Sequence, residues 1–92
     1  MNHQTEEIMT ILQEECGEVV VAISKCKRFG VHNLVPDSKE SNIQRLEKEI
    51  GDFNAMVELL IDQKLITIEK INEYKNAKFD KLRKWSNLKI AK

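Results

Sequence analysis

The sequence predicts an all-α protein, with three main helices forming a helical bundle that is completed by oligomerisation. Three segments of the 92-residue chain repeat apolar residues at three- and four-residue steps, which is the spacing of one helix face. There is only one proline and there are three glycines, and no segment favours a strand over this pattern. Residues 1–92 are expected to form a single domain. Because so short a chain buries a limited share of its surface, pairing with further copies is also expected.

The first helix is expected at residues 5–28. It ends at Phe29-Gly30, where glycine suits a C-terminal cap. Cys16 and Cys26, the only cysteines, would lie roughly 15 Å apart on this helix and could not bridge. Free cysteines fit a reducing cytosol. The apolar positions of the helix are Ile8, Ile11, Leu12, Val19, Ile23 and Cys26.

A loop and the second helix follow. Pro36 and Asp37 interrupt the pattern and predict a loop at residues 30–41. Ser41 and Gln44 then have the spacing of a capping box, in which Ser41 would be the N-cap. The second helix is expected at about 42–63, with Ile43, Leu46, Ile50, Phe53, Val57, Leu60 and Ile61 on one side.

The third helix is expected from residue 68 to the high 80s. It follows the short connector 64–67, whose last residue, Thr67, would be its N-cap. Its apolar residues in register are Ile68, Ile71, Phe79, Leu82 and Trp85.

The charge is balanced overall but unevenly distributed. The net charge is zero, which gives no general reason to expect nucleic-acid or membrane partners. The polar, acidic N-terminus is not a signal peptide, and no apolar run approaches membrane-spanning length, so we expect a cytoplasmic protein. Residues 1–63 carry a net charge of −6 and residues 64–92 a net charge of +6, so these parts should attract each other.

Four carboxylates stand out on helical wheels drawn at about 100° per residue. In the first helix, Glu15 falls inside the apolar stripe and Glu18 falls at its edge. In the second helix, Glu49 falls inside the stripe and Asp52 at its edge. Buried, unpaired carboxylates are costly and repel one another, so positive charge must offset them. It could come from a hard divalent cation, which prefers oxygen ligands, or from ion pairs with lysine or arginine.

Several lysines complement this acidic pattern. Lys75 and Lys78 fall within the apolar stripe of the third helix. Either their stems lie along apolar surface with the ammonium in water, or they point at the acidic site or at phosphates held there. Lys25 lies seven residues after Glu18, on nearly the same line of the first helix, and is followed by Arg28. Helix C-termini favour such cations in any case.

The acidic residues form two motifs, Glu14-Glu15-Cys16-Gly17-Glu18 and Glu49-Ile50-Gly51-Asp52. The first has the form E-E-x-x-E and the second the form E-x-x-D. This arrangement resembles the MazG-like group of all-α nucleoside triphosphate pyrophosphohydrolases, and looks especially like short single-domain members often seen in phages. Asn76-Ala77-Lys78-Phe79 also resembles the family's later helix, whose lysine serves phosphate.

The resemblance implies an Mg²⁺-dependent enzyme, with Mn²⁺ as an alternative ion, that converts a (deoxy)nucleoside triphosphate to monophosphate and pyrophosphate. A homodimer or homotetramer is expected. Glu14 or Glu15 would accept the proton of the attacking water. Lys78 and Lys25 would contact phosphate oxygens. The metal ligands would be Glu15, Glu18, Glu49 and Asp52.

Three other interpretations compete with this one. The first is a non-enzymatic dimeric helical interaction or regulatory module, in which Lys75 and Lys78 neutralise the carboxylates. Another is a redox metal bundle, but that chemistry normally uses a Glu-x-x-His arrangement, which this chain lacks. A third keeps the fold and changes the substrate, for example to a phosphoribosyl-nucleotide or an alarmone.

Overall fold

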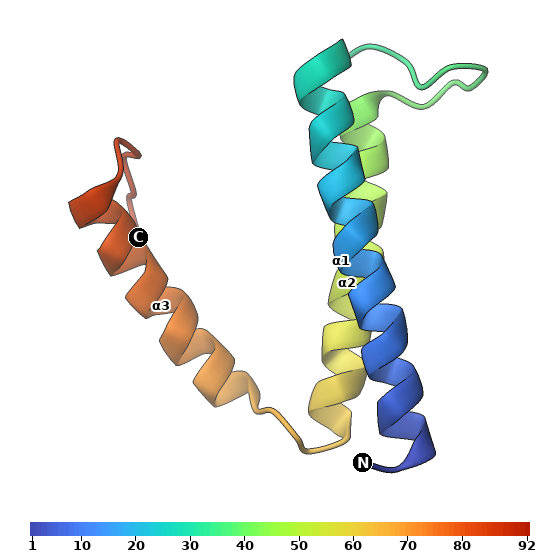
Figure 1. The fold of residues 1–92 in the computed structure, drawn as a ribbon. Coiled ribbons are helices and arrows are strands. Elements are labelled where there is room, and N and C mark those ends of the chain that lie inside the picture. Colours follow the sequence, from blue (N-terminus) through green and yellow to red (C-terminus); the bar gives the residue numbers. More distant parts are fainter.

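The structure is a computed structural model that describes residues 1–92. It contains three α-helices and no β-strand, which confirms the all-α prediction (Figure 1). The helices are α1 (His3–Phe29), α2 (Asn42–Asp62) and α3 (Ile68–Trp85). No helix is both long enough and apolar enough to cross a membrane.

The start of α1 is fixed by two contacts. The side chain of Asn2 accepts a hydrogen bond of 2.7 Å from the backbone N–H of Thr5, so the helix begins two residues earlier than predicted. The buried Thr5 donates its hydroxyl to Gln63 Oε1 at 3.0 Å. This bond ties the beginning of α1 to the residue that follows α2.

The predicted caps are present. Gly30 ends α1 with a φ of 93°, and its N–H donates to the carbonyl of Cys26. Ser41 and Gln44 form the predicted capping box at the start of α2, and Thr67 caps α3. Lys64, with a φ of 64°, turns the chain between α2 and α3. These local signals set the helix boundaries within a few residues of the predicted ones.

Only α1 and α2 pack together along their length, as an antiparallel pair, while α3 diverges from them and gives the molecule a V shape (Figure 1). The chain is flat, with extents of 40 × 38 × 15 Å. Only 6 of the 92 residues are buried and none of them lies on α3, so the single chain does not close a bundle. The buried residues are Thr5, Ile8, Ala22, Cys26, Asn42 and Leu60.

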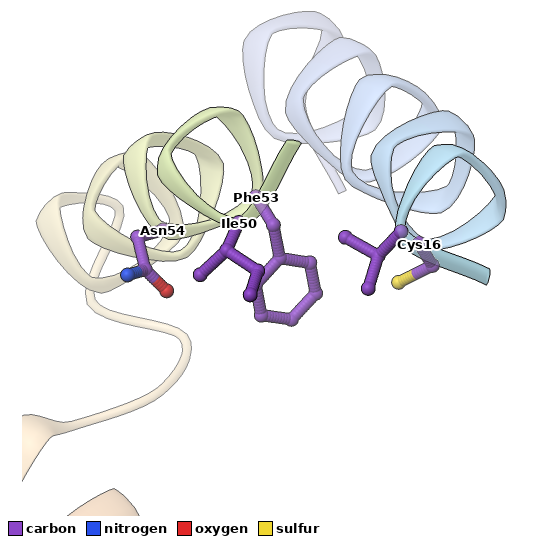
Figure 2. Close-up of a pocket in the computed structure, with 5 residues that line it drawn as sticks. Cys16, Ile50, Phe53 and Asn54 are labelled. Carbon is purple, nitrogen blue, oxygen red and sulfur yellow. The ribbon is translucent and has the colours of Figure 1, made fainter. Parts of the chain in front are cut away.

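An apolar groove of about 340 Å³ runs between α1 and α2 and is open to solvent. Figure 2 shows Cys16 of α1 and Ile50 and Phe53 of α2 pointing to the same side of the pair. Val19 and Asn54 complete its lining. No residue of α3 lines this groove, and most residues of the predicted apolar stripes are only partly buried.

Candidate metal centre

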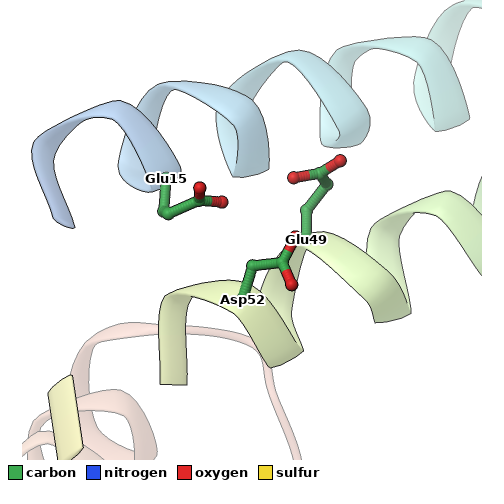
Figure 3. A group of neighbouring side chains, drawn as sticks. All are labelled: Glu15, Glu49 and Asp52. Atoms are coloured by element: carbon green, nitrogen blue, oxygen red, sulfur yellow. The ribbon is translucent and has the colours of Figure 1, made fainter. Parts of the chain in front are cut away.

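Three carboxylates from two helices converge at the middle of the α1–α2 pair (Figure 3). Glu15 comes from α1, and Glu49 and Asp52 come from successive turns of α2. One carboxylate oxygen from each lies within 4.8 Å of the others. We call these three residues the acidic cluster.

The acidic cluster follows from the positions of its residues on the helices. Glu49 and Asp52 are three residues apart and therefore neighbours on the surface of α2. Glu15 lies in the apolar stripe of α1, which faces α2. The antiparallel packing of α1 on α2 then brings Glu15 opposite the other pair. The cluster lies along the edge of the α1–α2 pair opposite the groove of Cys16 and Ile50, which follows from their wheel positions.

The carboxylate of Glu15 is partly removed from water. Its Oε2 atom is buried and has no hydrogen-bond partner. Burial raises the pKa of Glu15 above its ordinary value, and the neighbouring negative charges of Asp52, Glu49, Glu18 and Glu14 raise it further, in that order. A buried carboxylate oxygen without a hydrogen-bond donor is costly, and a bound cation would offset that cost.

The oxygen ligands fit a hard divalent cation. The cluster contains no histidine or cysteine, and carboxylate oxygens are the ligands that Mg²⁺ and Mn²⁺ prefer. The three ion pairs of the structure join Arg45 to Glu40, Lys70 to Glu73 and Arg83 to Asp80. None of them neutralises the cluster, so the lysine pairing required by the interaction-module interpretation does not occur within one chain.

Glu18 and Glu14 lie beside the cluster rather than in it. Both are exposed on α1. Glu18 and Glu49 together line a small cavity of about 80 Å³ at the same edge of the helix pair. The role of Glu18 as a metal ligand stays a prediction.

The two predicted phosphate-binding lysines lie in different places. Lys25 lines the same small cavity as Glu18 and Glu49. The structure thus brings it next to the edge of the helix pair that carries the acidic cluster and Glu18, which we call the acidic edge. Lys78 is exposed on α3, the helix that diverges from the pair. The fold of one chain does not bring Lys78 to the cluster.

Sequence reasoning missed Arg45. This half-buried residue also lines the small cavity, and it forms an ion pair with Glu40 of the preceding loop. The hydrogen bond that Arg45 Nε donates to the Glu40 carboxylate and the negative charge of Glu40 raise the pKa of Arg45, with smaller contributions from the charges of Glu49 and Glu18. The sequence spacing could have placed Arg45 near the site, because Arg45 precedes Glu49 by four residues and therefore lies on the same side of α2.

Comparison with known protein families gives one match. The family model described as the MazG nucleotide pyrophosphohydrolase domain matches residues 3–85, which include all three helices. No curated protein and no solved structure matches the chain. The family match spans both acidic motifs and most of the 92 residues. The chain therefore belongs to the MazG nucleotide pyrophosphohydrolase domain family.

Proposed function

We propose that this protein hydrolyses a nucleoside or deoxynucleoside triphosphate to the monophosphate and pyrophosphate, with Mg²⁺ or Mn²⁺ as its cofactor. The observation that carries the proposal is the buried, unpartnered Oε2 of Glu15 opposite the carboxylates of Glu49 and Asp52. Membership of a nucleotide pyrophosphohydrolase family supports a nucleotide as the substrate.

Glu15, Glu49 and Asp52, joined by Glu18, would hold the cation. When bound, a divalent cation neutralises phosphate charge and lowers the pKa of a coordinated water. A carboxylate oxygen of Glu14 or Glu15 that is not a ligand would accept the proton of the water that attacks the α-phosphorus. Holding water and phosphorus in line supplies much of the rate, since the reaction needs little covalent participation from the protein.

Cations at the acidic edge would bind the phosphate oxygens. Lys25 and Arg45 both line the small cavity beside Glu18 and Glu49. Arg45 presents a planar fork of donors that suits phosphate, and Glu40 orients it. Lys78 would reach the phosphates of a site in another copy, because its own helix diverges from the cluster.

A homodimer or homotetramer is part of this proposal. With 6 of 92 residues buried, one chain removes little apolar surface from water, and association with further copies would remove more of it. The open groove of Cys16, Val19 and Phe53 would be covered by a second copy. The net charge of −6 in residues 1–63 and of +6 in residues 64–92 favours contact between the basic segment of one copy and the acidic helices of another.

Activity is tested by a pyrophosphate-release screen across the common nucleoside and deoxynucleoside triphosphates, with Mg²⁺ or Mn²⁺. Glu49→Gln should abolish metal-dependent turnover and leave the helical circular dichroism largely unchanged. Glu47→Gln is the matched control, because Glu47 is exposed and outside the acidic cluster. Full activity in Glu49→Gln would remove Glu49 from the site.

The oligomer is tested by sedimentation of the wild type and of Ile50→Asp. Ile50 lines the groove and is 42% exposed in the single chain, so a charge there should weaken association without entering a core. The wild type should sediment as a dimer or tetramer, and Ile50→Asp should shift toward the monomer. A wild type that is monomeric at micromolar concentration would contradict this part of the proposal.

A further inference from the structure

We propose that a second cavity, between the C-terminal end of α1 and the loop that precedes α2, binds the base and sugar of the nucleotide. The inference rests on the proposed function and adds the direction in which the substrate lies. The cavity measures about 520 Å³, within the range of small-molecule sites. Its lining residues are Lys25, Arg28, Phe29, Asn33, Leu34, Pro36 and Asn42.

Hydrogen bonds hold the wall of this cavity in place. Asn42, only 3% exposed, donates its side-chain amide to the carbonyl of Gly30 at 2.9 Å. Its backbone N–H donates to the carbonyl of Asn33 at 2.9 Å, and Ile43 N–H donates to Val31 at 2.9 Å. The loop is thereby attached to the end of α1, so hydrogen bonds within the chain hold the wall of the cavity.

The lining combines an aromatic ring, aliphatic surface, amides and cations. Phe29 is half exposed, with the guanidinium of Arg28 4.9 Å from its ring centroid. Leu34 is 58% exposed beside it. The helix dipole accounts for cations in the last turn of α1. It does not account for an exposed aromatic ring with aliphatic and amide neighbours, which is the lining that a stacked, hydrogen-bonding base requires.

The two cations of the cavity are available to a ligand. Lys25 and Arg28 take part in none of the ion pairs of the structure. The guanidinium of Arg28 lies over the ring of Phe29 and would also contact a bound base, since guanidinium groups pack well against aromatic planes. Lys25 would meet the phosphate end.

Lys25 connects this cavity to the acidic edge, because it also lines the small cavity with Glu18, Arg45 and Glu49. Seven residues of helix separate Glu18 from Lys25, a rise of about 10 Å. That length suits a nucleoside monophosphate with its phosphate at the acidic edge and its base in the loop cavity. The leaving pyrophosphate would then lie on the far side of the cluster from the loop.

The test uses equilibrium binding of the four deoxynucleoside monophosphates and, separately, of pyrophosphate, measured by calorimetry in the presence of Mg²⁺. Phe29→Leu keeps apolar bulk but removes the ring. It should weaken the best-binding monophosphate about fivefold or more, because base stacking is lost. Arg28→Ala should weaken the same monophosphate. Lys27→Ala is the matched control, since Lys27 is an exposed cation of the same helix turn outside the cavity lining.

Pyrophosphate affinity should be unchanged in Phe29→Leu and Arg28→Ala. Variants that bind pyrophosphate more weakly but bind the monophosphate normally would overturn the inference. So would variants that bind the monophosphate as well as the wild type does, or a wild type that binds no monophosphate. Binding does not depend on turnover, so the two proposals fail separately. If the wild type binds the monophosphate but cleaves no triphosphate, and Phe29→Leu weakens that binding, the proposed activity is refuted and the proposed base site is supported.

Discussion

Addition of Mg²⁺ should stabilise the folded protein, and Glu49→Gln should remove that stabilisation. The acidic cluster places three carboxylates within 4.8 Å with no ion pair, so a divalent cation relieves their repulsion in the folded chain and has no comparable site in the unfolded one. At a free Mg²⁺ concentration 100 times Kd, mass action gives about 2.7 kcal/mol. For a chain of this length, that energy raises Tm by roughly 10–20 °C.

The assay is thermal unfolding followed by circular dichroism, in chelator and across an Mg²⁺ titration, at fixed protein concentration. Glu49→Gln removes one negative charge beside Glu15, so in chelator it should melt no lower than the wild type. In Mg²⁺ the order should reverse, because the variant lacks one of the carboxylates proposed to hold the cation. An equal Mg²⁺ shift in wild type and Glu49→Gln, or no shift in either, would refute a metal site built on the cluster.

Three further outcomes follow from single contacts. Burial and neighbouring charge raise the pKa of Glu15, so protonation of Glu15 stabilises the folded state. Without metal, that stability should be lost as pH rises from about 4.5 through the raised pKa. Thermal melts of Glu15→Gln in chelator should not show this decline. Ser41→Ala breaks the capping box with Gln44 and should cost about 1 kcal/mol in urea unfolding, whereas an unchanged midpoint would mean that the cap contributes nothing. Glu40→Gln releases Arg45 and should raise the KM for the triphosphate while leaving the Mg²⁺ shift of Tm intact; an unchanged KM would separate Arg45 from phosphate binding.

The helices could be predicted because their signals are local. The capping box at Ser41, Thr67 at the start of α3 and Gly30 at the end of α1 all act within a few residues, and the structure contains each of them. The start of α1 was predicted two residues late. Asn2 was not recognised as an N-cap, although its side chain accepts from the N–H three residues on.

The centre of the candidate site could also be predicted, for a physical reason. A carboxylate within an apolar stripe costs free energy that something must offset, so Glu15 and Glu49 stood out from other acidic residues. The structure brings both together with Asp52. Arg45 was overlooked because a charged residue at the border of the apolar stripe of α2 does not interrupt the apolar spacing. The loop cavity could not be predicted at all, since it depends on Asn42 bonding to residues 9 and 12 positions earlier.

The position of α3 relative to the other two helices could not be predicted from the sequence of one chain. Its apolar residues at helical spacing predict a buried face but do not say which surface buries it. In the structure no residue of α3 is buried, and the groove between α1 and α2 is also uncovered. Two exposed apolar surfaces, one on a basic segment and one on an acidic pair of helices, complement each other in both apolarity and charge. Within one chain α3 diverges from the pair after the turn at Lys64 (Figure 1), which is why we propose a second copy as the partner of both surfaces.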